Sequence, residues 1–476
     1  MSDRGELAIV LHTHMPYVEG FGTWPSGEEW LWEAMATCYV PLLDLLDRGA
    51  PLTLSLTPVL CDQLEAPGIT ARFTEFVREV RTFTHREDAR GLREAGDEVL
   101  AGELERALGL YEASLERLLE RGGSLLPAFA RHASWTSSAT HAILPLIASE
   151  ALLRVQLDTG VRSHRDRFTG AWSGGFWLPE CAYSPELDRE LARAGVRRTC
   201  VELTERLGLG AAGHLRPMLT EAGVLLLPID RASIARAWSD EGYPAQGPYR
   251  DSHRRTVHNH NPWANDGGAY DHPRALQTAR GHAADFVSRT TARLEEHGRG
   301  LPGGGLVVFA VDTEFFGHWW YEGLAWLEAV VEECARQGLA LVHLDEAAAL
   351  QHPAPPPPEA RDPAASSWGA NEDLSTWSGG GADGVAEMAF RTRAAELELL
   401  AARDRAGAAA LRELLALQAS DWAFMVTRRL AGPYAQERFA GHLGGFERAL
   451  HDGPQASRDA LRNLAVHADA GALREP

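Results

Sequence analysis

Lysine is absent from this chain of 476 residues, so its basic side chains are arginines and histidines. This absence excludes enzymes that depend on a lysine Schiff base, on the lysine of a phosphate-binding P-loop or on a kinase-type lysine. Cysteine is also scarce: the five cysteines are widely spaced and form no C-x-x-C pair. That pattern argues against a disulfide framework and against a thiolate zinc site. We expect the cysteines to be small buried side chains.

Long apolar runs are missing as well, and no stretch reaches the roughly 18 residues that a membrane-spanning helix requires. The N-terminus lacks the basic start and the small-residue cleavage site of a signal peptide, which predicts a cytoplasmic protein. The formal net charge of −20 disfavours nucleic acid and anionic lipid surfaces as partners. A neutral or cationic partner fits this charge better. The oligomeric state is left open by the sequence.

Short apolar runs that end abruptly in polar residues are numerous, which is typical of buried parallel strands. They lie at 7–11, 52–56, 176–178, 196–201, 224–229, 306–311 and 339–344. Helical patterns separate many of them, for example Leu324 to Gln337, with Gly338 as the stop. About seven strands alternating with helices predict an open or incomplete α/β barrel rather than a full eightfold one.

Two regions break this alternation. Residues 66–128 contain no strand pattern but a long amphipathic helix that ends at Gly122-Gly123, which predicts a helical insertion in the barrel. A proline-rich stretch at 351–365 resembles a linker, and the pattern after it is helical. The predicted organisation is therefore a barrel formed by 1–65 and 129–350, the insertion at 66–128, the linker, and a C-terminal helical domain at 366–476.

Three polar clusters follow predicted strands, where parallel α/β barrels carry their reactive groups. His12 and His14 are two residues apart, so both face the barrel mouth, as sugar ligands, metal ligands or buried structural histidines. Glu180 follows an aromatic strand, and a part-buried carboxylate there must be paired, hydrogen-bonded or functional. Asp312 ends a five-residue apolar run, and Glu314 is the second choice in that cluster.

Two carboxylates at different strand ends, with histidines and tryptophans nearby, are the components of a glycosidase. If the carboxyl groups lie about 5–5.5 Å apart, one attacks the anomeric carbon and the other acts first as acid and then as base. The chain has 14 tryptophans, several of them in polar, glycine-rich segments, and an indole face suits a sugar ring. Trp177 beside Glu180 is one candidate for sugar packing. Together the tryptophans favour a carbohydrate substrate.

Several motifs resemble those of the family 57 glycoside hydrolases and, within that family, of the α-1,4-glucan branching enzymes. They are His-Thr-His-Met-Pro at 12–16, Ala-Thr-His-Ala-Ile-Leu-Pro at 139–145, Gly-Phe-Trp-Leu-Pro-Glu-Cys-Ala-Tyr at 175–183, Asp-Thr-Glu-Phe-Phe-Gly-His-Trp-Trp-Tyr-Glu-Gly at 312–323, Ser-Ser-Trp-Gly at 366–369 and Gln-Ala-Ser-Asp-Trp at 418–422. The four strand-end motifs stand in the family's order, whereas His-x-His alone would be a weak signal.

The resemblance implies an incomplete (β/α)7 barrel with a helical insertion and a C-terminal α-helical domain. It implies Glu180 as nucleophile, Asp312 as general acid/base, and no metal or organic cofactor. Substrate-binding residues implied by it are His12, His14 and His141 in the donor subsite and the aromatic residues Trp30, Trp263, Trp368 and Trp377. An active-site loop is implied near Arg236 to Arg250, with Tyr243 at its tip.

The leading hypothesis is a branching enzyme that cleaves α-1,4 bonds of an amylose- or glycogen-like glucan and forms α-1,6 branches. A 4-α-glucanotransferase or an α-amylase would use the same carboxylates with a different acceptor. A metal-dependent deacetylase or mannosidase using His12 and His14 is a second class, which a chelator would reveal. A third is a glucan-binding homologue without activity.

Overall fold

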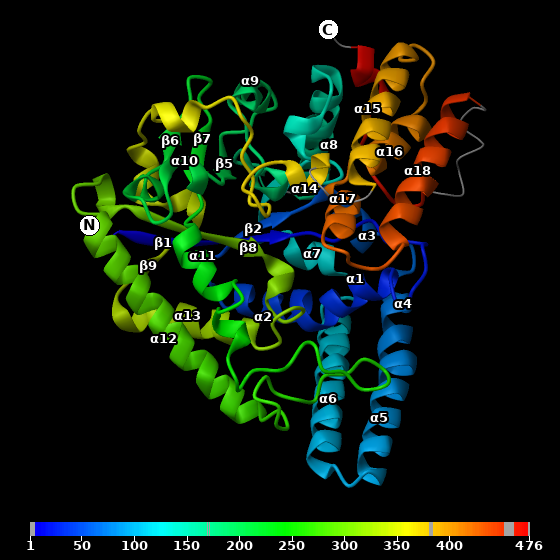
Figure 1. Cartoon of the computed structure of the whole chain (residues 1–476), viewed down its shortest axis with the longest axis vertical. Coiled ribbons are helices and arrows are strands. Elements are labelled where there is room, and N and C mark those ends of the chain that lie inside the picture. Colours follow the sequence, from blue (N-terminus) through cyan, green and yellow to red (C-terminus); the bar gives the residue numbers. More distant parts are fainter. Residues whose placement is uncertain (1–4, 169, 171, 380–383, 452–460, 475–476) are drawn as a thin grey trace.

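One curled sheet forms the centre of the computed structural model, which describes residues 5–168, 170, 172–379, 384–451 and 461–474 (Figure 1). Its strands run in the order β6-β7-β5-β4-β3-β2-β1-β8, with β9 paired to β1. All neighbours are parallel except β6 and β7, so the seven parallel strands along this order, from β7 to β8, build an incomplete (β/α)7 barrel, and β9 adds a short parallel pairing with β1. The strands are β1 (Glu6–Thr13), β2 (Thr53–Leu56), β3 (Ala133–Ser137), β4 (Gly175–Trp177), β5 (Arg198–Val201), β6 (Met218–Leu219), β7 (Leu225–Pro228), β8 (Leu306–Asp312) and β9 (Ala340–Leu341).

The pair β1 and β8, at one end of this strand order, is apolar on both faces, as expected for strands covered by helices on one side and by the barrel interior on the other. The residues from Leu7 to Leu11 are fully buried. The parallel register sets His12 directly beside Asp312, so the polar ends of the two strands lie together. The parallel pairing of β1 and β8 therefore brings His12 and Asp312 together.

Helices alternate with the strands around the sheet. Helix α13 starts one residue before its predicted first residue and ends before Gly338, whose φ of 75° is the left-handed conformation that glycine adopts without strain. The helices of this layer are α1 (Glu28–Ala34), α2 (Val40–Asp47), α3 (Pro58–Leu64), α8 (Glu150–Arg167), α9 (Asp188–Arg193), α10 (Thr204–Leu207), α11 (Arg231–Ala237), α12 (His272–His297) and α13 (Gly323–Gln337).

Between β2 and β3 the chain leaves the barrel and forms helices α4 (Ile69–Glu75), α5 (Thr82–Glu94), α6 (Glu98–Glu120) and α7 (Leu125–Phe129). Figure 1 shows α5 and α6 side by side as a long pair that projects from the barrel. The buried face of α6 includes Leu104, Leu108, Leu115 and Leu118, which are residues of the predicted amphipathic pattern.

The C-terminal region is helical, with a short α14 (Ser375–Ser378) followed by α15 (Val385–Ala401), α16 (Ala408–Leu417), α17 (Ser420–Thr427) and α18 (Tyr434–His451). These helices share a core that also contains Tyr17 and Val59 from the barrel. The C-terminal helices are therefore packed directly on the barrel, beside the loops that follow β1 and β2. Figure 1 shows α15, α16 and α18 as neighbours at one side of the sheet.

Two details differ from the sequence analysis. The proline-rich stretch is not a free spacer, because the Leu219 amide donates to the Ala354 carbonyl (2.7 Å) and the Ala354 amide to that of Pro217 (3.0 Å). The apolar run at 339–344 yields only the two-residue β9, whereas β3 was not predicted. All five cysteines are buried and free, as expected. None of the described helices is both long and apolar enough to cross a bilayer.

Candidate active site

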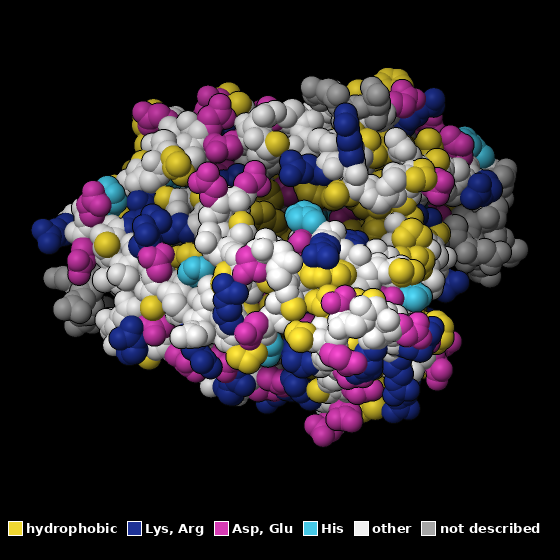
Figure 2. Space-filling model, turned by 60° about the horizontal axis from the view of Figure 1, so that its bottom comes forward, with side chains coloured by type: hydrophobic (Ala, Val, Ile, Leu, Met, Phe, Trp, Pro, Cys, Tyr) yellow, Lys and Arg dark blue, Asp and Glu magenta, His cyan; other side chains and the backbone are white. Residues whose placement is uncertain are grey.

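Side chains from the carboxyl ends of several strands meet at one edge of the sheet. His12 lies near the end of β1, Asp312 ends β8, Glu180 follows β4, and His141 follows β3. One face of the molecule is hollowed near its middle, and hydrophobic side chains gather along the hollow (Figure 2). Such an edge is where parallel α/β folds build their catalytic sites.

The backbone at Glu180 is unusual for a residue with a side chain. Its φ is 59°, and Cys181 has a φ of 50°, so two successive residues adopt the left-handed region. His141 shares this conformation, with a φ of 59°. Such conformations cost roughly 1–3 kcal/mol each and persist where the surroundings hold them, often at functional sites. At Glu180 the turn takes the chain out of β4 directly after Pro179.

Both carboxylate oxygens of Glu180 accept hydrogen bonds. The indole Nε1 of Trp368 donates to Oε2 over 2.6 Å, and the hydroxyl Oγ of Ser420 donates to Oε1 over 3.3 Å. Burial raises the pKa of Glu180 to about 7, while the Trp368 and Ser420 donors act against this rise. The donors orient the carboxylate and favour its ionised form, which is the form that a nucleophile needs.

Trp368 is itself held from two sides. Its amide donates to the Glu180 carbonyl over 3.0 Å, and the guanidinium of Arg231 donates to the Trp368 carbonyl over 3.3 Å. Arg231 in turn lies 3.7 Å from the fully buried carboxylate of Glu202, just after β5. The position of the indole therefore depends on residues from two further barrel elements.

Asp312 and Glu314 form an acidic pair in the same part of the site. Burial raises the pKa of Asp312 well above its ordinary value, and the neighbouring charges of Glu314 and Glu180 raise it further. Burial also raises the pKa of Glu314 to about 7, although the Tyr39 hydroxyl donates to its Oε1 over 2.6 Å. A carboxyl that keeps its proton near neutral pH is suited to act as a general acid.

Three histidines lie beside these carboxyl groups. The Nε2 atoms of His12 and His141 lie 2.9 Å apart, so one ring donates to the other, and the Nδ1 of His141 lies 2.8 Å from the Ser420 hydroxyl. Burial lowers the pKa of both His12 and His141, with the nearby charge of His14 as a further cause. These two rings are therefore neutral and serve as hydrogen-bonding groups.

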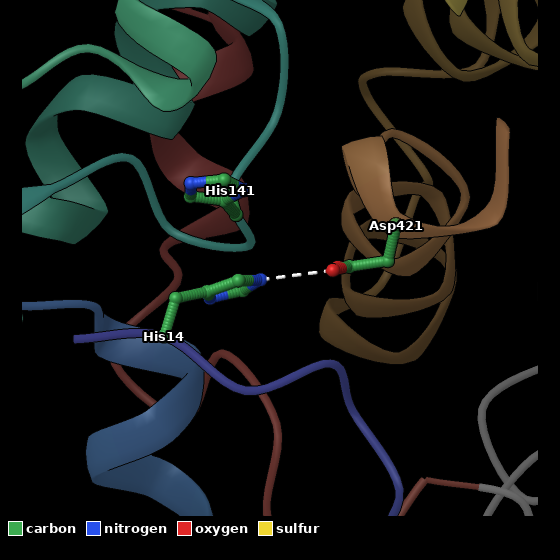
Figure 3. A group of neighbouring side chains, drawn as sticks. All are labelled: His14, His141 and Asp421. Carbon is green, nitrogen blue, oxygen red and sulfur yellow. Dashed lines mark hydrogen bonds and ion pairs between the residues drawn. The ribbon is translucent and has the colours of Figure 1, made fainter. Parts of the chain in front are cut away.

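His14 behaves differently because Asp421 of α17 faces it, as Figure 3 shows. Its Nε2 lies 2.9 Å from Oδ1 of Asp421, and its Nδ1 lies 3.1 Å from the Thr57 hydroxyl. Burial opposes a charge on the ring, but the Asp421 carboxylate, together with the nearby charges of Glu314 and Glu180, raises the pKa of His14. An imidazolium here offsets part of the surrounding negative charge.

The side chains of His14, His141 and Asp421 could also hold a metal ion, since their ligand atoms all lie within 4.8 Å of one another. Each ring nitrogen of these two histidines already has a side-chain partner within 3.1 Å. The histidine nitrogens are therefore all paired, whereas Oδ2 of Asp421 is buried without a hydrogen-bond partner among the described residues. An ion there would have to displace several of those contacts.

Two of the predicted aromatic residues have defined places near this cluster. Trp368 reaches Glu180, and Trp30 is half-buried between the barrel and the C-terminal helices, with its ring 5.3 Å from that of Tyr434. The side chain of Trp177 is fully buried, and its part in sugar binding stays a prediction. It stacks beneath His12 at 4.6 Å and contacts Trp368 at 5.2 Å. Through these two contacts the buried indole of Trp177 supports the site.

The other predicted aromatic residues lie apart from the carboxylates. Trp377 is 3% exposed and lines a cavity of about 350 Å³ that Ser420 also borders. Trp263 is half-buried, with the Arg254 guanidinium 4.1 Å from its ring centre. The part of Tyr243 in substrate binding also stays a prediction. Its ring stacks on His282 and its hydroxyl donates to Asp285, so it packs against α12 rather than over the site.

The sequence analysis did not assign Ser420 and Asp421 to the site, although they stand in the motif at 418–422. Their signal was a pair of polar residues between an apolar run and Trp422, at the start of α17. Strand-end reasoning does not find them because they come from a helix outside the barrel.

The comparisons with known proteins agree with this arrangement. Residues 8–356 match the family model for glycosyl hydrolase family 57, so the chain belongs to that family. Residues 383–468 match the model for the C-terminal domain of 1,4-alpha-glucan branching enzymes.

Relatives and solved structures cover most of this chain. A probable 1,4-alpha-glucan branching enzyme of Mycobacterium tuberculosis is 32% identical, aligned over 97% of this chain and 94% of that protein. A 1,4-alpha-glucan branching enzyme of Thermococcus kodakarensis is 29% identical, over 94% of this chain and 74% of that one. The crystal structure of a branching enzyme of this family from Pyrococcus horikoshii superposes with a TM-score of 0.88, at 28% identity and with 99% of this chain and 98% of that one covered.

Proposed function

We propose that this protein is an α-1,4-glucan branching enzyme, which cleaves α-1,4 bonds and re-forms the chain as α-1,6 branches. The observation that carries the proposal is the buried carboxylate of Glu180, oriented by two donors, together with Asp312, which ends β8 beside His12 of β1. The branching-enzyme model over 383–468 supports this acceptor choice, since Ser420 and Asp421 lie within that region. The substrate is an α-glucan such as amylose or a glycogen-like polymer, and the site of action is the cytoplasm.

In the first step the Glu180 carboxylate attacks the anomeric carbon, and the bond from that carbon to the glycosidic oxygen breaks. Asp312 donates its proton to the leaving oxygen, which becomes the 4-hydroxyl of the departing chain. The glycosyl group stays on Glu180 as an ester. In this retaining mechanism the two carboxyl groups are expected to lie about 5–5.5 Å apart.

In the second step a glucan 6-hydroxyl attacks the same carbon from the opposite side of the ester bond. Asp312, now ionised, takes the proton of that hydroxyl, and the Glu180 carboxylate leaves. Two displacements retain the α configuration. The neutral rings of His12 and His141 and the imidazolium of His14 are proposed to line the donor subsite, and Trp30, Trp263, Trp368 and Trp377 to flank the glucan.

The competing assignments differ in the acceptor rather than in the carboxylates. A 4-α-glucanotransferase would transfer to a 4-hydroxyl, an α-amylase would transfer to water, and an inactive homologue would only bind glucan. The ligand set of His14, His141 and Asp421 is the observation that keeps the metal-dependent class in view.

Incubation of the purified protein with amylose, followed by debranching and chain-length analysis, separates these assignments. We expect new α-1,6 linkages with little free reducing sugar, and their loss in Glu180→Gln and Asp312→Asn. Redistributed linear chains would indicate a 4-α-glucanotransferase, and reducing ends alone would indicate a hydrolase. Unchanged amylose would refute the proposal.

A further inference from the structure

Two exposed indoles lie beside the site, and the catalytic scheme above does not use them. Trp238 is 43% exposed and Trp319 is 49% exposed, which is unusual for the largest side chain in a structure with a well-packed core. Their ring centres are 5.3 Å apart, and the planes meet at 77°. The pair therefore forms a corner of two aromatic rings that are both partly exposed.

Trp238 directly follows helix α11. That helix starts beside the middle of β8, where the Asp230 amide donates to the Val308 carbonyl over 2.9 Å. The Asp230 carboxylate is held there by Arg293 of α12 at 2.6 Å. At its other end Trp238 stacks on Phe315, with ring centres 4.7 Å apart and planes 20° from parallel. Helix α11 thus runs along β8 toward the end that carries Asp312.

Trp319 is fixed by the tight loop that follows Asp312. Its amide donates to the Glu314 carbonyl over 3.0 Å, and the Gly317 amide donates to the Trp320 carbonyl over 2.8 Å. Gly317 has a φ of 97°, and a Cβ at that position would lie 2.1 Å from the Thr37 carbonyl oxygen. The loop can therefore be made only with glycine there, and it projects the indole of Trp319 next to that of Trp238.

We propose that Trp238 and Trp319 form a subsite that binds the incoming, acceptor glucan chain, an inference that rests on the proposed function. The apolar faces fit an uncharged polymer, and two faces at a steep angle can contact successive rings of a curved α-1,4 chain. The subsite is close to the acid/base along the chain, because Phe315, which stacks on Trp238, is three residues from Asp312. It would hold the acceptor near the residue that deprotonates it and so favour transfer over hydrolysis.

Binding of maltoheptaose, measured by calorimetry, tests the subsite without turnover in the Glu180→Gln protein. Adding Trp238→Ala or Trp319→Ala should weaken binding about tenfold, whereas Trp238→Phe should keep most of the affinity because a flat ring remains. Phe83→Ala is the matched control, since Phe83 is 60% exposed on α5 of the insertion, and it should leave binding unchanged. In the active protein, both alanine variants should raise the share of hydrolysis relative to transfer.

Unchanged affinity and an unchanged hydrolysis share in both alanine variants would overturn the subsite. A changed oligomeric state with unchanged affinity would also overturn it and would assign the corner to a contact between two copies of the chain. A different result would refute the proposed function without refuting the subsite. A wild-type protein that forms only α-1,4 products while both alanine variants lose affinity would refute branching and retain the subsite.

Discussion

The ionised form of Glu180 depends on few contacts, because its carboxylate is buried while, among the residues that the structure describes, only Trp368 and Ser420 donate to it. We expect Trp368→Phe to lower kcat about 10- to 100-fold, the usual effect of losing a hydrogen bond to a charged group. Without the indole donor, the pKa of Glu180 rises above about 7. The acid limb of the pH–rate profile should therefore move to higher pH.

A matched control for this substitution is Trp172→Phe. Trp172 also donates through its indole Nε1, but to the Gly175 carbonyl at the start of β4, at the opposite end of that strand from Glu180. It should leave the acid limb in place. An unshifted acid limb in Trp368→Phe would show that the indole does not favour the ionised carboxylate.

Ionisation of Glu180 should lower the stability of the folded protein. Its pKa is about 7 in the folded protein and near 4.5 in the unfolded chain, so the folded state binds the proton more tightly. Between those two values stability falls as the pH rises, because the folded state must hold a buried charge. Glu180→Gln should therefore be more stable than the wild type at pH 8 by on the order of 1 kcal/mol.

Thermal unfolding of both proteins at pH 8 and pH 4 measures this difference. At pH 4 the wild-type carboxyl is protonated in both states, so the two melting temperatures should converge. A constant difference across the range would mean that the amide alters packing rather than charge.

Among the elements, α17 connects the C-terminal helices to the barrel chemistry through the contact between Asp421 and His14. We expect Asp421→Asn to lower the pKa of His14, because burial would then act against the imidazolium with less compensation. Activity should fall about tenfold or more as the charge pattern around Glu180 and Asp312 changes. NMR titration of the His14 ring together with a pH–rate profile measures both effects.

Asp404→Asn, at an exposed position of the same helical region, should change neither quantity. An unaltered His14 pKa in Asp421→Asn would mean that the ring is charged for another reason, such as Glu314.

Strand prediction from the sequence succeeded where burial on both faces produced apolar runs, as in β1 and β8. It missed β3, whose residues Ala133–Ser137 include two serines and a threonine. That strand is buried because its polar groups bond internally: the Thr136 hydroxyl donates to the Gly160 carbonyl and that of Ser137 to the Trp177 carbonyl. Hydropathy patterns do not report such pairing. The apolar run at 339–344 produced the opposite error. It predicted a longer strand, but only two of its residues form β9, which pairs with β1.

For the molecule as a whole, the residues at strand ends were predictable because parallel strands bring their carboxyl ends together. Ser420 lies 240 positions from Glu180 in the chain, and no local pattern indicates that contact. The direction in which a side chain points was equally hidden, as with the buried Trp177 and with Tyr243 against α12. Strand ends could thus be located, while the helices that complete the site needed the tertiary structure.

A metal-independent mechanism is a further expectation for the whole protein. Because the nitrogens of His14 and His141 already bond to protein groups, prolonged treatment with EDTA should leave the rate of amylose conversion unchanged. Treatment followed by repletion with Zn²⁺ is the control. A chelator-dependent loss that Zn²⁺ restores would support the metal-dependent class and contradict our mechanism.

The most direct test of the account is to trap the glycosyl group on Glu180. A maltosyl fluoride donor needs no acid to expel its leaving group, whereas removal of the glycosyl group still needs the base Asp312. Asp312→Asn should therefore accumulate a covalent adduct, and peptide mass spectrometry should locate the added maltosyl mass on Glu180. An adduct on another residue, or turnover of the fluoride with inverted configuration and no adduct, would contradict the retaining mechanism proposed for this protein.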